Sequence, residues 1–260
     1  MKIGQKLAMM EHMNKPTVSV ITTTYNNADN LRQTMEMILS QDYEQIQYVI
    51  VDGGSTDETL TLIREYEPRF GERLKWISEP DEGIYDAINK GYLLSDGDII
   101  GYCFDRYADE HVISRMVDTI VREKTDGVHS DLIYLDGDKV VRKWHMGQGS
   151  IRTGWMPAHP TLYLKREVYE KYGLYKTDYK CSADYEYMIR CLKDGQVTLS
   201  YIPEVLIYMY YGGTSTNGLS SYLLSLKEGH RALKENGMAF AWVTDFLRII
   251  RVCLQFLTKS

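Results

Sequence analysis

Residues 48–57 read YVIVDGGSTD, an apolar run that leads directly into an aspartate, two glycines and a serine. An unbroken apolar run is typical of a strand that is buried on both faces, as in a parallel sheet covered by helices. Residues 18–26 (VSVITTTYN) have the same form, because their apolar run ends in threonines, a tyrosine and an asparagine. Helical periodicity follows each stretch. Both stretches therefore predict a strand that ends in a polar loop and is followed by a helix.

Two further strands are expected at residues 74–77 and 98–102, with a helix at residues 84–94 between them. Alternating strands and helices predict an α/β fold with a mostly parallel central sheet flanked by helices. In such sheets, ligands gather at the carboxyl ends of the strands. The polar residues that follow each strand are therefore the candidate site.

The pattern changes after Arg122. Asp136-Gly137-Asp138 lies between two apolar runs and predicts a β-hairpin, so we expect a mixed or antiparallel second half. Its further elements are expected to be a helix at residues 182–193 and strands at residues 161–165, 197–202 and 205–211.

Composition excludes several classes of protein. The 260 residues carry a net charge of -6, which argues against a broad nucleic-acid surface. The four cysteines form no CxxC pair, so neither a zinc site nor a disulfide framework is expected. No run approaches the ~20 apolar residues of a membrane span, and the N-terminus lacks the pattern of a signal peptide. We therefore expect a cytoplasmic protein.

The loop after the first predicted strand offers hydroxyl, aromatic and amide groups at Thr23, Tyr25 and Asn26. A nucleoside can stack on Tyr25, although a turn rich in Thr and Asn explains these residue types equally well. After the second strand, Asp52 can accept hydrogen bonds from a pyrimidine or a ribose, and Gly53 permits close backbone approach. Ser55 with Glu58 predicts a capping box for the following helix.

In this order and at these separations, residues 22–26, 52–57 and 78–91 resemble the family 2 glycosyltransferases with the GT-A fold. The stretch GIYDAINKG at residues 83–91 is typical of bacterial members that build polysaccharide or lipopolysaccharide. The resemblance extends over residues 16–211. It implies that a UDP-sugar donor is held by the residues Thr23, Tyr25, Asn26, Asp52, Gly53, Asp81 and Asp86.

The resemblance also implies two aspartates after the fourth strand, which place Mn²⁺ or Mg²⁺ on the diphosphate. Asp105 matches the first position and is the expected metal ligand, but Arg106 stands where a second acid is expected. Asp105 acting alone, Asp105 helped by Asp109, and Arg106 binding the diphosphate without a metal all remain open. Weakened or lost activity is a further alternative.

Residues 183–190 (ADYEYMIR) resemble the helix start that carries the family's catalytic base, and the matching residue is Asp184. The resemblance implies that Asp184 takes the acceptor's proton in a single, inverting displacement. Without the family, Asp184 is an acid at a helix N-terminus, favoured by the helix dipole. Glu186 is the next candidate for the base. His159 is weighed as an acceptor contact against a structural role.

We expect residues 16–237 to form the GT-A domain, with a nucleotide-sugar half at 16–122 and an acceptor half at 123–237. Residues 238–260 predict an amphipathic helix with a basic edge. This helix either contacts the inner face of the cell membrane or packs against the domain or a second copy of the chain. Residues 212–216 (GGTST) resemble a loop that closes over the diphosphate.

The expected function is transfer of a sugar from a UDP-sugar to a glycan or lipid-linked acceptor in cell-surface polysaccharide biosynthesis, without nucleic-acid partners. A nucleotidyltransferase is the first competitor, but the glycine-rich phosphate loop that it needs near the first strand is absent from the sequence. The second is a nucleotide-binding protein with weak or lost activity, which the Asp105-Arg106 segment favours.

Overall fold

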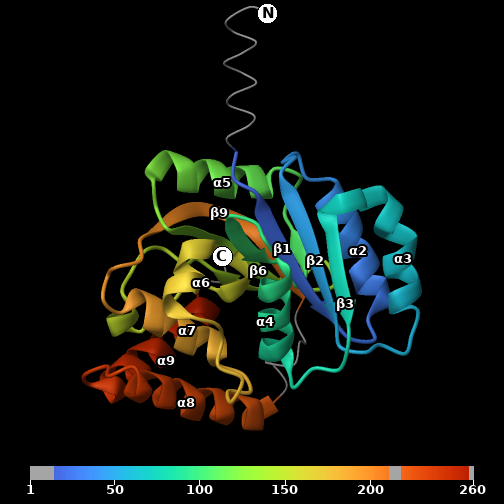
Figure 1. Cartoon of the computed structure of the whole chain (residues 1–260). Coiled ribbons are helices and arrows are strands. Elements are labelled where there is room, and N and C mark those ends of the chain that lie inside the picture. The colour runs from blue at the N-terminus through green and yellow to red at the C-terminus, as the bar shows by residue number, and fades with distance from the viewer. Residues whose placement is uncertain (1–14, 211–217, 258–260) are drawn as a thin grey trace, which may run out of the picture.

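The computed structural model describes residues 15–210 and 218–257, and its helices lie on both faces of one nine-stranded sheet (Figure 1). The strands are β1 (Val18–Thr24), β2 (Ile46–Asp52), β3 (Leu74–Ser78), β4 (Ile99–Tyr102), β5 (Arg106–Tyr107), β6 (Gly127–Asp136), β7 (Lys139–Trp144), β8 (Tyr163–Lys165) and β9 (Leu199–Tyr210). The α-helices are α2 (Ala28–Leu39), α3 (Thr59–Phe70), α4 (Ile84–Leu94), α5 (Val112–Glu123), α6 (Arg166–Tyr172), α7 (Ala183–Leu192), α8 (Gly218–Glu235) and α9 (Ala241–Leu257).

The first half of the chain forms the parallel part of the sheet. β1 pairs in parallel with β2 on one side and β4 on the other, and β3 extends the sheet beyond β2. Every residue of β2 is buried, which explains why its sequence shows no alternation of apolar and polar residues. The predicted α/β fold with flanking helices is confirmed. In Figure 1 the arrowheads of β1, β2 and β3 point toward the end from which α4 begins.

The second half is mixed. β6 and β7 form the predicted hairpin, and β8 is antiparallel to both β4 and β6. β9, however, is parallel to β6, because the intervening segment with α6 and α7 returns the chain to the same end of the sheet. One sheet therefore spans the predicted boundary at residues 122 and 123.

Two strand predictions are wrong. The expected strands at 197–202 and 205–211 are one strand, β9, which continues past Pro203 through a shift of register opposite Asp131. A proline has no N–H to donate, and a bulge absorbs it without ending the strand. The strand expected from Thr161 begins only at Tyr163, because His159–Thr161 forms a 3₁₀ turn.

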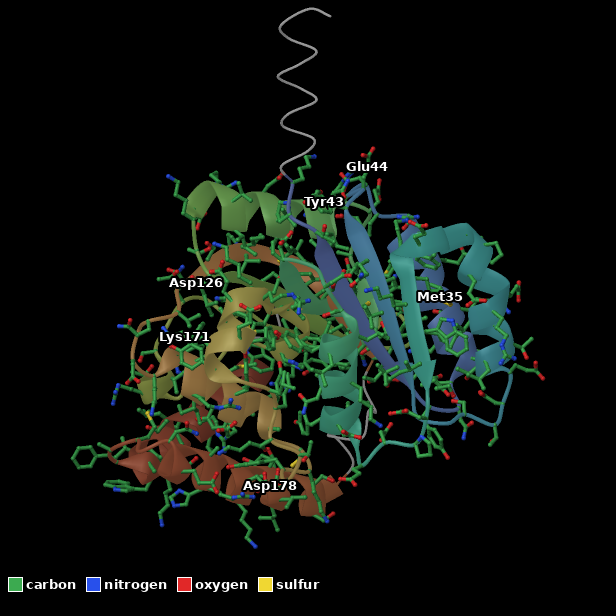
Figure 2. All side chains as sticks on the ribbon, in the orientation of Figure 1. Met35, Tyr43, Glu44, Asp126, Lys171 and Asp178 are labelled. Carbon is green, nitrogen blue, oxygen red and sulfur yellow. The ribbon has the colours of Figure 1, made fainter. Side chains whose placement is uncertain are left out.

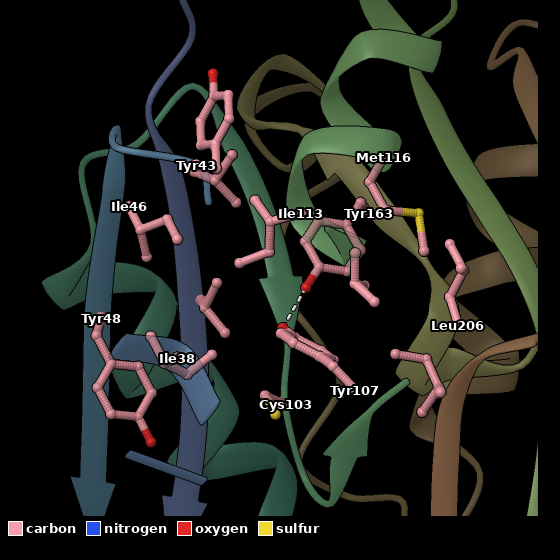
Figure 3. Packing of buried hydrophobic residues seen from close by; sticks show 14 of the residues in the cluster. Ile38, Tyr43, Ile46, Tyr48, Cys103, Tyr107, Ile113, Met116, Tyr163 and Leu206 are labelled. Carbon is pink, nitrogen blue, oxygen red and sulfur yellow. Dashed lines mark hydrogen bonds between the residues drawn. The ribbon is translucent and has the colours of Figure 1, made fainter. Parts of the chain in front are cut away.

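Two hydrophobic clusters lie on opposite faces of the sheet. α2, α3 and α5 pack on one face, and α4, α6 and α7 pack on the other. In the first cluster the buried hydroxyls of Tyr107 and Tyr163 meet at 2.5 Å beside Cys103 (Figure 3). A Cβ atom at Gly101 would lie 2.2 Å from the Tyr163 ring, so only glycine fits there. This packing holds the end of β4, which leads to Asp105.

α8 and α9 pack together below α7 in Figure 1. Arg231 of α8 pairs with Asp178, which lies at the edge of the molecule beside α8 (Figure 2). Along α9, Trp242, Phe246 and Ile250 are 69%, 61% and 38% exposed. Their spacing of four residues places them on one face, so α9 carries an outward apolar stripe.

Candidate functional site

The loop after β2 folds around the carboxylate of Asp52. Oδ2 accepts hydrogen bonds from the N–H groups of Gly54 (3.1 Å) and Ser55 (2.9 Å) and from the Ser78 hydroxyl (2.7 Å). Oδ1 accepts the Ser55 hydroxyl at 2.5 Å. Asp52 is fully buried. Its hydrogen bond from Ser78 joins the ends of β2 and β3. Its direct contact with a nucleoside remains a prediction.

The predicted capping box of α3 is wrong. Ser55 binds Asp52 instead, and α3 begins at Thr59, whose N–H is accepted by Asp57. The Ser55 hydroxyl oxygen also accepts the N–H of Asn26 at 2.7 Å. Ser55 therefore connects the loops that follow β1 and β2.

Asn26 also connects the loops that follow β1 and β2. Its backbone has φ of +46°, a left-handed conformation that asparagine tolerates, and its Oδ1 accepts the N–H of Thr56 at 2.8 Å. The preceding residue, Tyr25, is left with a ring that is 63% exposed. Thr23 is half-buried at the end of β1, in register with Val51. The loop therefore presents one free aromatic face.

Tyr25, Gly53 and Asp81 meet at one point. A Cβ atom at Gly53 would lie 2.7 Å from Oδ2 of Asp81 and 3.4 Å from the Tyr25 ring. Asp81 uses its other oxygen, Oδ1, to accept the N–H of Gly83 at 3.0 Å. Two predicted donor contacts, Tyr25 and Asp81, thus flank the bare backbone of a third, Gly53, and the three follow the ends of three strands.

Asp86 supports the loop before α4. Its Oδ2 accepts the Glu82 N–H at 3.1 Å and lies 3.2 Å from Nζ of Lys90, which also pairs with Glu79 at 3.0 Å. Asn89 exchanges two hydrogen bonds with the backbone of Tyr175. The polar face of α4 therefore fixes the loop between β3 and α4 and the segment between α6 and α7, and contact of Asp86 with the donor remains a prediction.

Asp184 lies in the first turn of α7, as predicted. Its Oδ1 accepts both the Tyr85 hydroxyl (3.1 Å) and the Tyr185 N–H (2.9 Å), and no described residue donates to its Oδ2. Burial and then the charge of Asp184 raise the pKa of Tyr85 well above its usual value, so this hydroxyl stays protonated and donates. One oxygen of Asp184 is therefore held in place while the other stays available.

Tyr134 lies on β6, a long strand of the second half. Burial raises the pKa of Tyr134, the charge of Arg142 lowers it, and the charges of Asp105 and Asp184 raise it. The Arg142 guanidinium lies 5.0 Å from the Tyr134 ring centroid. The predicted metal ligand and the predicted base therefore both act electrostatically on this tyrosine, which sequence reasoning did not identify.

Asp105 follows β4, and burial raises the pKa of its carboxyl to about 6. Asp109 is not free to help it, because its carboxylate pairs with Arg115. Arg106 is exposed and lies over the Tyr208 ring. In the part of the chain that the structure describes, no three His, Cys, Asp or Glu side chains gather as a metal site. Because Mg²⁺-type ions are often held by one carboxylate plus substrate phosphates and water, Asp105 fits a metal that the diphosphate shares.

Two other candidates have structural roles. His159 is buried, its Nε2 lies 2.9 Å from the Tyr175 hydroxyl, and burial lowers its pKa. Glu186 is fully buried and pairs with Arg190 and Lys176, so it does not face an acceptor. The loop at residues 212–216 lies outside the described residues.

The sequence pattern of Glycosyl transferase family 2 matches residues 19–181, and the chain belongs to this family. It is 31% identical over 213 residues to a PGL/p-HBAD biosynthesis glycosyltransferase of Mycobacterium bovis, with 78% of this chain and 80% of the relative aligned. The protein is therefore a glycosyltransferase, which decides against the nucleotidyltransferase alternative.

Solved structures show the same fold. The S. aureus TarS fragment 1-349 in complex with UDP-GlcNAc has a TM-score of 0.70 at 14% identity over 93% of this chain and 73% of that one. The match spans 44% of a longer TarS chain. The Pyrobaculum calidifontis mannosyltransferase PcManGT with GDP-Man and Mn²⁺ has a TM-score of 0.65 at 18% identity, over 95% and 76% of the two chains. Within residues 15–210 and 218–257, no helix is long and apolar enough to cross a membrane.

Proposed function

We propose that this family 2 glycosyltransferase moves a sugar from a UDP-sugar to an acceptor hydroxyl with inversion, and that Asp184 is the general base. The hydrogen bonding of Asp184 carries the proposal. Both of its donors, Tyr85 and the Tyr185 N–H, bind Oδ1, so Oδ2 is the oxygen that can accept a proton. A base that is held through one oxygen keeps the other at a defined place.

The reaction is a single displacement. The acceptor oxygen attacks the anomeric carbon, its proton passes to Oδ2 of Asp184, and the bond between the anomeric carbon and the diphosphate oxygen breaks. UDP leaves with the bonding electrons. Attack from the side opposite UDP inverts the anomeric configuration.

The donor binds at the ends of β1, β2 and β3. The exposed ring of Tyr25 stacks on the uracil, and Gly53 and Asp81 lie beside that ring. Asp52, Asn26 and Asp86 hold the loops, and Thr23 completes the donor pocket. The UDP-GlcNAc in the structure of TarS, a protein of the same fold, supports a UDP-sugar as the donor.

Asp105 would hold Mn²⁺ or Mg²⁺ together with diphosphate oxygens, and the ion would supply the counter-charge that the departing UDP needs. The Mn²⁺ in the PcManGT structure supports this role for a cation. Arg106 is the alternative counter-charge, because it is exposed and follows Asp105 directly.

The acceptor that we propose is a glycan or a lipid-linked sugar of cell-surface polysaccharide biosynthesis. The named role of the mycobacterial relative in PGL/p-HBAD biosynthesis supports a cell-surface product. The apolar stripe of Trp242, Phe246 and Ile250 favours contact of α9 with the inner face of the membrane from the cytoplasmic side. Pairing of two chains through the same stripe is the competing role.

The test is UDP release from a panel of UDP-sugars, with and without Mn²⁺, in the presence of candidate acceptors. We expect one or a few donors to be turned over. A protein with lost activity, which Arg106 favours, would bind UDP without releasing it from any donor.

A further inference from the structure

A pocket of about 350 Å³ lies between β7 with the loop that follows it and the helices α8 and α9. It is separate from the donor site, because no residue at the ends of β1 to β4 lines it. Neither the family match nor the relatives assign it a ligand. Its walls combine positive charge with aromatic and apolar side chains.

The charge of the lining points to an anion. Lys143, Arg248 and Arg251 line the pocket together with His145, and no carboxylate stands among the lining residues that the structure describes. The chain as a whole carries a net charge of -6, so this concentration of cations is local. Of the acids nearby, Asp131 pairs with His145, and Asp245 pairs with both His230 and Arg248.

Arg248 is a largely buried cation of the pocket lining. Its side chain is 11% exposed and forms an ion pair with Asp245, whose Oδ1 lies 3.5 Å from Nη2, and within the described residues Nη2 has no hydrogen bond. Asp245 therefore offsets part of the charge of Arg248. A Cβ atom at Gly229 would lie 2.3 Å from Nη1 of Arg248, so the glycine leaves room for the guanidinium.

The remaining lining suits an apolar or sugar-bearing group. Trp144 and Trp155 come from the β7 side, and Ile249 and Val252 come from α9. The indole N–H of Trp155 already donates to the Met146 carbonyl at 2.9 Å, so its ring serves as a packing surface. The pocket therefore fits a phosphate that is carried on an apolar stem.

The pocket borders the proposed acceptor side. Arg248 lies 4.4 Å from the ring centroid of Tyr185, the neighbour of Asp184. Ser225, which lines the pocket, lies 3.3 Å from the Ser182 hydroxyl at the start of α7. On the other side, the Arg142 guanidinium lies over both Tyr134 and Trp144, at 5.0 and 4.9 Å.

We propose that this pocket binds the phosphate of a lipid-linked acceptor, with Lys143, Arg248 and Arg251 holding the phosphate and Trp144 and Trp155 packing on the stem. The inference rests on the proposed function and names its acceptor class. The helix that carries Arg248 and Arg251 also carries the exposed apolar stripe, so the same helix would contact both the phosphate headgroup and the membrane.

The test is calorimetric binding of geranyl phosphate, geraniol, inorganic phosphate and glucose 1-phosphate to the full chain. We expect geranyl phosphate to bind at least about tenfold more tightly than each of the others, and more weakly at high salt. Equal binding of geraniol would overturn the anion site. Equal binding of glucose 1-phosphate would overturn the lipid stem.

Arg251→Gln and Lys143→Gln should each weaken geranyl phosphate binding by about tenfold, because each removes a charge-assisted contact. Arg122→Gln is the matched control, since this exposed arginine of α5 pairs with Glu123 far from the pocket lining and should change nothing. Unchanged affinity in both pocket variants would refute the proposal. Arg248 is left intact because its packing on Tyr185 makes misfolding a risk.

The two proposals can fail separately. Geranyl phosphate binding is measured without donor and does not depend on turnover. Failure of the pocket would leave UDP release intact, whereas failure of the proposed function would abolish UDP release and leave the binding of geranyl phosphate unaffected.

Discussion

Changing Tyr85→Phe removes the one side-chain hydrogen bond that orients Asp184. The phenol oxygen donates to Oδ1 at 3.1 Å, and the ring is buried and stacked on Tyr175 with centroids 6.0 Å apart. Phenylalanine keeps this packing, so the variant should fold with a nearly unchanged Tm. Only the hydrogen bond from the Tyr85 hydroxyl to the Asp184 carboxylate is lost.

The size of the effect follows from the two bonds on Oδ1. A hydrogen bond to a charged group contributes about 1.5 to 3 kcal/mol, and each 1.4 kcal/mol corresponds to about tenfold in rate. The Tyr185 N–H remains, so orientation is weakened rather than lost. We expect kcat to fall by about tenfold, while the KM for the UDP-sugar and the affinity for UDP stay within about twofold.

Steady-state kinetics, UDP calorimetry and thermal unfolding separate these effects. Tyr92→Phe is the matched control, because Tyr92 lies on the same helix and packs on Tyr169 rather than on Asp184. Its kcat should equal that of the native protein. A Tyr85→Phe variant with native kcat would refute the positioning role, and a parallel fall in Tm would assign Tyr85 to stability alone.

EDTA should abolish transfer and Mn²⁺ should restore it, and Asp105→Asn should lose this rescue while still folding, whereas full turnover in EDTA would shift the counter-charge to Arg106. Burial lowers the pKa of His129 to about 4, so as pH falls from 6.5 toward 4 the unfolded chain gains a proton that the folded chain does not, and stability should drop by roughly 3 kcal/mol. Chemical denaturation of His129→Phe across this pH range should show a smaller fall of the unfolding free energy with pH. An unchanged fall would exclude His129 as its cause. Trp242→Ser with Phe246→Ser should reduce flotation with anionic liposomes without lowering Tm, because both rings are exposed; flotation equal to that of the native chain would favour pairing of two chains instead.

The first half of the fold could be predicted from local pattern. Each buried strand is an unbroken apolar run that ends in polar residues, so the runs at residues 18–21 and 48–51 indicate both the sheet and its functional edge. The path of β9 could not be predicted in this way. Its continuation past Pro203 depends on pairing with β6, a contact between residues about 70 positions apart.

The candidate site, like the fold, could be predicted only in part from local sequence. Asp184 and Asp105 were found by motif, but the hydrogen bond from Tyr85 that orients Asp184 joins residues 99 positions apart and depends on the packing of α4 against α7. The interpretation of Ser55 as a helix cap also depended on sequence neighbours alone, and Asp52 proved the stronger partner. A basic and aromatic run at residues 142–145 (RKWH) was the available signal for the pocket at β7.

The most direct test of the central claim is the transfer rate of Asp184→Asn, measured together with its affinity for UDP and the anomeric configuration of the native product. Asparagine keeps the shape of the side chain and cannot accept the acceptor's proton. We expect transfer to fall by about two orders of magnitude or more, UDP affinity to stay unchanged, and NMR of the native product to show inversion. Near-normal transfer by the variant would place the base elsewhere, and a product that retains the donor's configuration would contradict the single displacement itself.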